Sequence, residues 1–486
     1  MRIWIAVMLG LCVCTARGQD EQPTTNPATV VAEVRDLIRD RHSYAFLRIA
    51  DEAELDTLAD RAIERLGPTP TNRDLGDAIT WLLARTGDAH ASLRGWRSTL
   101  AGPFAPLLLA PMGNEPGSAV IAFDERRFPI DSKRLVVTSI DGVDIETWIT
   151  AAGEYVADGS PQLKRSRAVQ MLRYLGWLRT KLSLPPCDTA IYRLAPIDPA
   201  SEVEPRDHEI ELADHRAMYG EWPRARSSGF IEEGIGYLRF DRMHERPDGR
   251  DSERPAWRTI LRHAQALVID LRGNSGGSRD LVYEIVPRLI PEDHPPIVFT
   301  WARLRLQPGV RDDDEAAADR FMYPVSSRRW PPAHREAIRI HLREHGLADA
   351  LQPTAQFGRP VFGVVASASG DRFSGPVVVL IDESCFSAAD IMAAALAEVP
   401  GVELMGRPTG GGSAYIRRHE LELAPLEVRL GQMDSRRIDG RTFDGNGVQP
   451  DIHVPATPAD FLAGPDPLLD AALERLRKRM AESADS

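Results

Sequence analysis

The positions of apolar residues follow different spacings along the chain. From about residue 30 to residue 85, apolar residues recur every three or four positions, which is the spacing of one face of an α-helix. Residues 100–228 mix short runs typical of β-strands with helical stretches. From residue 229 onward, strand-like and helix-like segments alternate. The sequence therefore predicts a helical N-terminal region, a mixed middle region and an α/β core.

Two segments of the predicted core have the pattern of buried strands. Ala266–Leu271 and Pro376–Ile381 are almost continuously apolar, and each is followed by a turn and then by a helical stretch. The helices are expected around Asp280–Leu289 and at Ser387–Ala397. Strands that alternate with helices imply a largely parallel or mixed sheet with helices on its faces.

The same pattern divides the chain into segments. We expect a signal peptide at 1–18, a disordered lead at 19–29, an N-terminal helical region at 30–99, a mixed α+β module at 100–228, an α/β core at 229–460 and a C-terminal helix at 461–486.

The first residues have the pattern of a secretory signal peptide. A basic Arg2 precedes a short apolar run, Ile3–Cys14, which ends in Ala16-Arg17-Gly18. That run is too short to span a bilayer, and no later stretch is long enough to be a transmembrane helix. We therefore expect export to a periplasmic or extracellular compartment.

Composition excludes several kinds of partner. The formal net charge is −12 with no basic stripe to offset it, which argues against nucleic acid. The CxxC and HExxH spacings of metal sites are missing, so we expect neither a metal nor an organic cofactor. Cys187 and Cys385 remain after signal removal, and the sequence leaves open whether they pair; two buried thiols are the simpler expectation.

Ser387 stands where a predicted buried strand gives way to an Ala-rich helix. A hydroxyl at this point lies beside free backbone N–H groups and the positive end of a helix dipole. A nucleophile that attacks a carbonyl needs this arrangement, because negative charge develops on the neighbouring oxygen. The simpler interpretation is that Ser387 caps the helix.

Further segments contain residues suited to chemistry. Ala266–Gly277 ends in a glycine-rich turn whose N–H groups can approach a ligand oxygen closely. His90 lies among small and apolar residues, where a structural histidine is the simpler interpretation. Phe443–Ile452 is a turn-rich run with two carboxylates, and it also fits a plain loop before a strand.

The order of these motifs is more specific than any one of them. The chain reads GDAHASL at Gly87–Leu93, DLRGNSGG at Asp270–Gly277, SAAD at Ser387–Asp390, GRPTGGG at Gly406–Gly412 and DGNGVQPDI at Asp444–Ile452. In this order they resemble the C-terminal-processing, or tail-specific, serine peptidase family, which includes tricorn-type peptidases and retinoid-binding relatives. The His90 segment resembles the motif of members whose catalytic histidine lies in the N-terminal region.

The resemblance implies a core similar to the crotonase and Clp peptidase folds, with acyl transfer to a serine. Ser387 matches the family nucleophile. The N–H of Ala388, with that of Gly276 or Gly277, matches the oxyanion hole. The middle region, which includes Val136–Val143, resembles a divergent PDZ-like module without a clear carboxylate-binding loop.

One departure from the family pattern changes the expected mechanism. Many members use a lysine as the base, and Gly412 occupies that position here. The chain has four lysines, none of them between Ser387 and the last: Lys133, Lys164, Lys181 and Lys478. Nearby arginines cannot replace a lysine base, because a guanidinium does not give up its proton.

The resemblance then indicates a histidine base, which titrates near neutral pH. By motif, His90 matches the base of tricorn-like members and Asp444 matches the acidic residue of their charge network. Asp444 is one methylene shorter than the usual glutamate, and Ala89 replaces a serine found before the histidine in tricorn-type sites. Asp390 and Thr409 are expected to support the site.

The sequence therefore predicts an exported serine peptidase that cleaves peptides or unfolded protein through Ser387. A non-catalytic binding protein on the same fold and an esterase that uses the same serine are the alternatives. The sequence does not fix the substrate, the oligomeric state or whether Asp444 contacts His90 directly.

Overall fold

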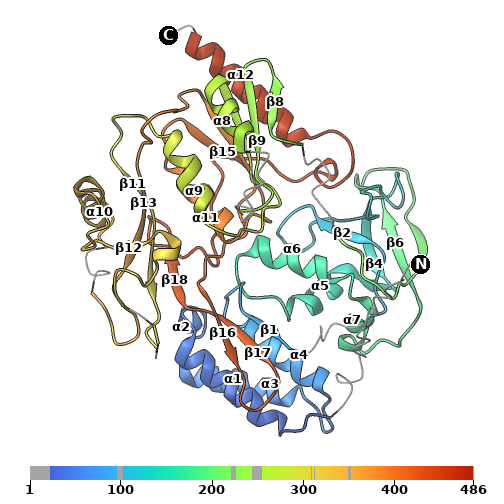
Figure 1. Ribbon diagram of the computed structural model, residues 1–486. Helices are drawn as coiled ribbons and strands as arrows, with labels where there is room; N and C mark the ends of the chain where they lie inside the picture. The colour runs from blue at the N-terminus through green and yellow to red at the C-terminus, as the bar shows by residue number, and fades with distance from the viewer. Residues whose placement is uncertain are drawn as a thin grey trace, which may run out of the picture.

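Figure 1 shows the fold as a computed structural model, which describes residues 22–95, 102–219, 226–243, 254–307, 309–310, 312–347 and 352–484. The predicted signal peptide, 1–18, lies outside these ranges. The predicted disordered lead extends too far, because helix α1 begins at Pro27 and Asn26 caps it. Within the described ranges, no helix is both long and apolar enough to cross a membrane.

The N-terminal region is a layer of amphipathic helices. Its helices are α1 (Pro27–Arg41), α2 (Ala45–Arg48), α3 (Glu52–Glu64) and α4 (Asn72–Ala84). Their apolar faces pack together and against two buried residues of strand β17, Val428 and Leu430. Helix α4 starts with a capping box formed by Thr71 and Asp74.

A three-stranded sheet joins the N-terminal helices to the C-terminal half of the chain (Figure 1). Its order is β1 (Ser92–Arg94), β17 (Glu427–Gly431) and β16 (Ile416–Glu420), and both pairings are antiparallel. Strand β1 begins two residues after His90, and Ser92 pairs with Arg429. This pairing brings the histidine segment to the core despite its distance along the chain.

Residues 104–213 contain an antiparallel sheet of order β2-β3-β4-β6-β7, with β5 beside β4. Its strands are β2 (Leu108–Pro111), β3 (Val120–Phe123), β4 (Val136–Ile140), β5 (Val143–Asp144), β6 (Thr189–Ala195) and β7 (Arg206–Glu211). The helices of this module are α5 (Ile145–Gly153), α6 (Pro161–Met171) and α7 (Leu175–Lys181). The indoles of Trp148 and Trp177 are buried in its core. Its likeness to a PDZ module stays a prediction.

The α/β core is built on a six-stranded sheet of order β19-β15-β14-β10-β9-β8. The strands are β8 (Gly229–Glu232), β9 (Ile235–Arg239), β10 (Ala266–Asp270), β14 (Val377–Ile381), β15 (Val402–Gly406) and β19 (Ile452–His453). All neighbours are parallel except β8, which pairs antiparallel with β9. Strands β10 and β14 are adjacent, so the turns after them lie at the same edge of the sheet.

Helices cover both faces of this sheet, as parallel strands require. Helices α8 (Arg254–His263), α9 (Asp280–Ile285) and α11 (Ala388–Ala397) contribute to one apolar cluster, and α12 (Pro467–Ala484) packs on the opposite face. The sequence predicted this helix at 461–486, but it begins later, at Pro467. A 3₁₀ turn at Pro458–Asp460 precedes α12.

A smaller mixed layer, at the left of Figure 1, flanks the core. Its strand order is β12 (Tyr323–Pro324), β13 (Val361–Val365), β11 (Ile297–Leu304) and β18 (Met433–Arg436), and α10 (Pro332–Glu344) packs on it. The predicted α/β class, with a helical N-terminal region and a mixed middle module, is confirmed.

Candidate active site

Ser387 lies at the junction between the turn after β14 and helix α11. Its backbone has φ 61° and ψ −119°, a conformation that is uncommon for a residue with a side chain. Backbone strain of this kind costs on the order of 1–3 kcal/mol and persists where the surrounding structure enforces it. Ser387 occupies the N-cap position of α11, but its side chain makes no capping hydrogen bond, so the interpretation that its hydroxyl caps the helix is wrong.

The glycine-rich turn after β10 contacts this serine directly. A Cβ atom on Gly276 would lie 2.7 Å from the Ser387 Cβ and 2.9 Å from the Ala388 nitrogen. The N–H of Gly276 already donates to the Asn274 Oδ1 (2.8 Å). Among the hydrogen bonds of the described residues, the N–H groups of Gly277 and Ala388 have no acceptor. These two groups are therefore the donors left for an oxyanion.

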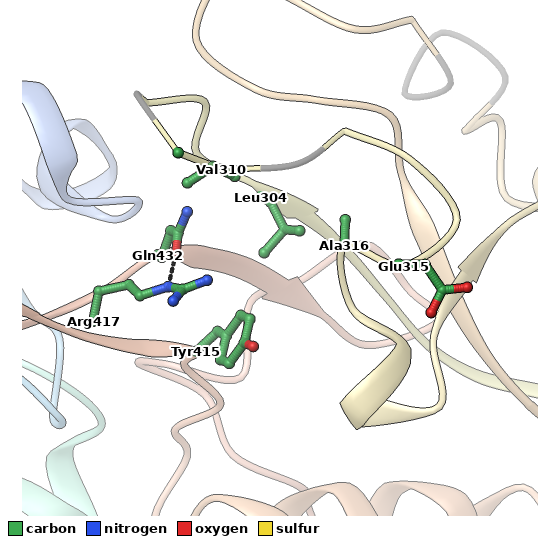
Figure 2. Close-up of a pocket in the computed structure, with 8 residues that line it drawn as sticks. Leu304, Val310, Glu315, Ala316, Tyr415, Arg417 and Gln432 are labelled. Atoms are coloured by element: carbon green, nitrogen blue, oxygen red, sulfur yellow. Dashed lines mark hydrogen bonds between the residues drawn. The ribbon is translucent and has the colours of Figure 1, made fainter.

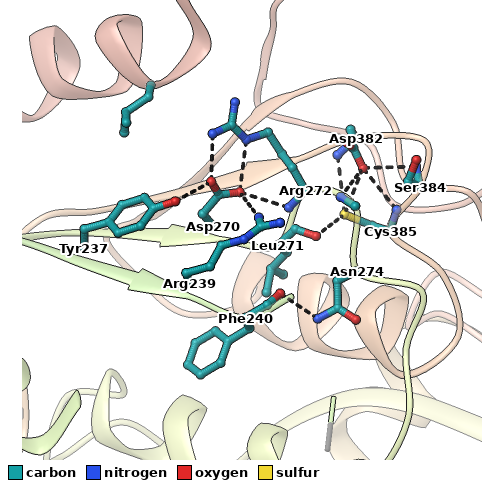
Figure 3. A network of polar contacts seen from close by, with 12 residues as sticks. Tyr237, Arg239, Phe240, Asp270, Leu271, Arg272, Asn274, Asp382, Ser384 and Cys385 are labelled. Atoms are coloured by element: carbon teal, nitrogen blue, oxygen red, sulfur yellow. Dashed lines mark hydrogen bonds and ion pairs between the residues drawn. The ribbon is translucent and has the colours of Figure 1, made fainter. Parts of the chain in front are cut away.

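A buried ionic network fixes the end of β10 (Figure 3). Asp270 accepts hydrogen bonds from the Arg272 Nε (3.0 Å), the Arg239 Nη1 (2.9 Å) and the Tyr237 hydroxyl (2.8 Å). Burial alone would raise the pKa of Asp270, but the two arginines lower it to about 2. The carboxylate is thus ionised and holds the chain where the glycine-rich turn begins.

Hydrogen bonds also tie the turns after β10 and β14 to each other (Figure 3). The Phe386 N–H donates to the Asn274 carbonyl (3.0 Å), and the Gly273 N–H donates to the Asp382 Oδ1 (3.1 Å). The Cys385 thiol donates to the Leu271 carbonyl (3.0 Å). The serine and its neighbouring N–H groups therefore sit on a cross-linked frame.

His90 reaches the site through a ring contact. Its imidazole stacks on the Phe386 ring with a centroid distance of 4.4 Å and an interplanar angle of 28°. Phe386 directly precedes Ser387, so the histidine lies beside the Ser387 segment. The imidazole is 9% exposed, and its Nδ1 has no hydrogen-bond partner among the described residues. Burial and the positive charges of Arg167 and Arg320 lower the pKa of His90 to about 4.

Asp444 lies in the same buried group. One carboxylate oxygen of Asp88, one ring nitrogen of His90 and one carboxylate oxygen of Asp444 all lie within 4.8 Å of one another. The Asp444 Oδ2 accepts a hydrogen bond from the Ser413 N–H (3.1 Å), while its Oδ1 has no partner among the described residues. Burial and the charge of Asp88 raise the pKa of Asp444 to about 8. The structure thus brings His90 and Asp444 together.

Two residues of this site were not predicted from the sequence. Asp88 accepts hydrogen bonds from the His42 Nε2 (3.0 Å), the Gly431 N–H (2.8 Å) and the His90 N–H (2.8 Å). His42 and Asp88 are both fully buried. The Asp-x-His spacing of Asp88 and His90 was a usable signal, whereas no local pattern distinguishes His42.

Residues 234–454 match peptidase family S41. The protein carries a peptidase family S41 domain. No match was found among curated proteins.

Solved structures of mature CPAF share its fold. The structure of mature CPAF complexed with lactacystin has a TM-score of 0.64 at 14% identity, over 94% of this chain and 98% of that one. The photosystem II D1 C-terminal processing protease has a TM-score of 0.44 at 13% identity, over 93% and 98% of the two chains. The tricorn protease has a TM-score of 0.39 at 15% identity, over 94% of this chain and 37% of that one.

In the S41 domain, Asp390 and Thr409 hold the loop that faces the serine. The Asp390 carboxylate accepts hydrogen bonds from the Thr409 hydroxyl and from the N–H groups of Gly411 and Gly412, both at 3.1 Å. Burial raises the pKa of Asp390 to about 7. The Thr409 oxygen also accepts the Val448 N–H (2.7 Å), so both residues act as supports of the loop.

A packing contact explains why no lysine stands at position 412. A Cβ atom on Gly412 would lie 2.2 Å from the Cε2 of Phe386, so the phenyl ring fills the space where a longer side chain would start. The same ring stacks on His90. The aromatic contact that positions the histidine therefore excludes a lysine from this position.

Helix α6 of the middle module contributes to the site of the S41 domain. The Gln162 amide donates to the Thr409 carbonyl (2.7 Å), and the Ser160 hydroxyl donates to the Gly410 carbonyl. Arg167 donates to the Ala89 carbonyl (2.8 Å), and its guanidinium lies 4.7 Å from the centre of the Phe386 ring. The middle module is therefore part of the frame around the active-site loop.

The group formed by Asp88, His90 and Asp444 has the donor types of a metal site. However, both oxygens of Asp88 already accept N–H hydrogen bonds from neighbouring groups. This arrangement suits a proton network around the histidine.

The two cysteines do not pair. Cys385 is buried, as expected, but Cys187 is exposed, so the expectation of two buried thiols is wrong for Cys187. It lies just before β6, where the chain runs at the surface of the middle module.

A cavity of about 200 Å³ lies beside Gln432, the residue that follows strand β17 (Figure 2). It is lined by Leu304, Gly309, Val310, Glu315, Ala316, Tyr415, Arg417 and Gln432. The Arg417 Nε donates to the Gln432 Oε1 (2.7 Å), and Gln432 directly follows Gly431, which binds Asp88. The cavity thus borders the strand that holds the Asp88 side chain.

We expect Gly276→Ala to lower kcat by roughly 10²-fold, because the added Cβ would push against Ser387 and the Ala388 N–H. The effect is measured as peptide hydrolysis with the folded fraction checked by thermal unfolding. Gly309→Ala is the matched control, because its added Cβ meets nothing within 4 Å. Equal rates for the Gly276 variant and the wild type would contradict the contact between turn and nucleophile.

Proposed function

We propose that this S41 peptidase is an exported enzyme that hydrolyses peptides or unfolded protein through a Ser387 acyl-enzyme, with His90 as the general base. The observation that carries the proposal is the strained Ser387 at the start of α11, next to two backbone N–H groups that have no acceptor among the described residues. The buried His90 imidazole stacks on Phe386, the residue before this serine.

In the proposed first step, His90 takes the proton of the Ser387 hydroxyl while the oxygen attacks the substrate carbonyl carbon. The N–H groups of Ala388 and Gly277, together with the positive end of helix α11, stabilise the oxyanion. His90 then gives its proton to the leaving amine, and the C–N bond breaks. Water attacks the acyl-enzyme with His90 again as base, which releases the acid product and restores Ser387.

Lysine is a poor candidate for the base on structural grounds as well. The Lys164 ammonium is paired with Asp158, and the Lys181 ammonium is paired with Asp77. Gly412 occupies the family position for a lysine and lies against Phe386. The expectation that this histidine titrates near neutral pH is wrong, because burial lowers its pKa to about 4. The imidazole is therefore neutral at neutral pH and can accept a proton.

The test compares substrate classes in one experiment. Purified protein is offered unfolded protein, peptides with free and blocked ends, and simple esters, and products are followed by mass spectrometry. We expect cleavage of internal peptide bonds. Hydrolysis of esters alone would favour the esterase, and tight peptide binding without product would favour a non-catalytic binding protein.

The pH profile gives a second, independent prediction. We expect kcat/KM for a peptide to stay level near neutral pH and to fall tenfold per pH unit below about pH 4, because the free enzyme needs neutral His90. If kcat/KM instead began to fall as the pH was lowered from the alkaline range, the base would have a much higher pKa, which would contradict a histidine base.

The profile needs a folding control. The pKa of His90 is lower in the folded protein than its ordinary value of 6.5, so the unfolded chain binds this proton more readily. The contribution of His90 to stability is therefore present above pH 6.5 and is lost as the pH falls towards 4. Circular dichroism at each pH separates this loss from the titration of activity.

A further inference from the structure

A second histidine and carboxylate lie behind His90. The His42 Nε2 is 3.0 Å from the Asp88 Oδ2, and both side chains are fully buried. The Asp88 Oδ1 is 3.7 Å from the His90 Nδ1 and accepts the His90 backbone N–H (2.8 Å). Asp88 thus lies between the two imidazole rings.

The hydrogen bonds of His42 fix its tautomer. Its Nδ1 accepts the Tyr44 backbone N–H (3.1 Å), so this nitrogen carries no proton. The Nε2 must then carry the proton and donate it to Asp88. In this orientation His42 donates to the carboxylate and holds it in place.

The two carboxylates near His90 are held very differently. Asp88 accepts three N–H hydrogen bonds, and a Cβ on Gly431 would lie 2.8 Å from its Oδ2. Asp444 accepts one backbone N–H, and its Oδ1 has no hydrogen-bond partner among the described residues. The nearby Tyr44 hydroxyl favours its ionised form, but burial and the charge of Asp88 outweigh this effect. Two neighbouring buried carboxylates do not both ionise readily, so the better-bonded one keeps the charge.

The pKa values agree with this division. Burial would raise the pKa of Asp88, but its hydrogen bonds and the neighbouring histidines lower it to about 2. Burial and the charge of Asp88 raise the pKa of Asp444 to about 8. The two pKa values are therefore shifted in opposite directions, so Asp88 keeps a negative charge more readily than Asp444 does.

We infer that Asp88, held by His42, is the carboxylate that orients His90 and balances its charge when it takes up the Ser387 proton. Asp88 and His42 are positioning residues that act through His90, and the inference rests on the proposed function. Asp444 then serves the network as a neutral carboxyl group.

The first test compares two charge-removing variants on one peptide. Asp88→Asn is expected to lower kcat by about 10³-fold with little change in KM, because the imidazolium loses its counter-charge. Asp444→Asn is expected to lower kcat by less than about 10-fold at pH 7, because it replaces a neutral group. A larger loss for Asp444→Asn than for Asp88→Asn would overturn the inference.

A pair of His42 variants tests the orienting role. His42→Gln can keep an N–H donor near the Asp88 Oδ2, whereas His42→Leu cannot. We expect the leucine variant to lose at least about tenfold more kcat than the glutamine variant, at similar KM. Equal losses would mean that His42 only fills space. This pair keeps the inference testable if Asp88→Asn does not fold.

The last readout does not depend on activity. In a Ser387→Ala background, the titration of His90 is followed by NMR of labelled histidine. The groups that act on His90 are Asp88 from its own loop, Asp444 from the 443–447 turn, Arg167 of α6 and Arg320 of the 3₁₀ turn Ala318–Arg320.

Asp88 is the group that raises the pKa of His90, so Asp88→Asn should move the midpoint below about 4, whereas Asp444→Asn should leave it near there. If Asp444→Asn shifted the His90 midpoint and Asp88→Asn did not, the inference would be overturned. Retained hydrolysis by Ser387→Ala would instead overturn the proposed function, and the titration would still report on Asp88.

Discussion

Replacing Ser387 with alanine is expected to lower kcat for peptide hydrolysis by about 10⁴-fold or more. The variant keeps the free N–H groups of Ala388 and Gly277 and the buried His90, but it lacks the oxygen that forms the acyl-enzyme. Binding of peptide should change little, because the rest of the site is unaltered. The rate is measured under single-turnover conditions together with KM.

Ser384→Ala is the matched control for this variant. Ser384 lies three residues upstream in the same turn, and its backbone N–H, which donates to Asp382, is kept in the variant (Figure 3). We expect its kcat to stay within about twofold of wild type. If Ser387→Ala retained most of its rate while Ser384→Ala lost it, the nucleophile would be misassigned.

Replacing His90 with glutamine is expected to lower kcat by about 10³-fold or more, because the variant lacks the neutral imidazole that takes the Ser387 proton in the proposed first step. KM should stay within a few-fold, since the side chain contacts Phe386 rather than the space in front of the N–H groups. The measurement is kcat and KM at pH 7 for the same peptide.

Two controls separate chemistry from packing in this experiment. His90→Phe keeps an aromatic ring against Phe386 but has no basic nitrogen, and it should be as inactive as the glutamine variant. His294→Gln changes a histidine whose Nδ1 contacts the carbonyl of the adjacent Pro295, and it should be fully active. A His90→Phe variant with wild-type kcat would show that only the ring matters.

The sequence was sufficient to predict the strand, turn and helix around Ser387. Apolar runs at 266–271 and 376–381 predict buried strands, and alternation with helices predicts that they are parallel. Adjacent parallel strands β10 and β14 put the turns that follow them at one edge of the sheet, so Gly276 meets Ser387. Regular periodicity and local turn chemistry carry this information.

The histidine side of the site depends on long-range contacts that periodicity does not encode. Strand β1 is three residues long, yet its pairing with β17 brings His90 beside residues more than three hundred positions away. His42 and Asp88 lie 46 positions apart in the sequence, and they also meet only in the folded chain. Motif resemblance identified His90 and Asp444, but it gave no information on which carboxylate is ionised.

Two details of local geometry also required coordinates. The φ value of Ser387 and its missing capping hydrogen bond show a strained residue, where the sequence alone made a helix cap the simpler interpretation. The close contact between Gly412 and the Phe386 ring gives a steric reason for the absent lysine. A single substitution in the motif is thus explained by an aromatic residue twenty-six positions earlier.

Covalent labelling with a serine-reactive phosphonate tests the central claim most directly. The site of modification is located by mass spectrometry in the wild type, in Ser387→Ala and in His90→Gln. We predict labelling of Ser387 in the wild type and none in either variant over the same time. Unlabelled wild type, or equal labelling of Ser387 after loss of His90, would contradict a nucleophile activated by this histidine.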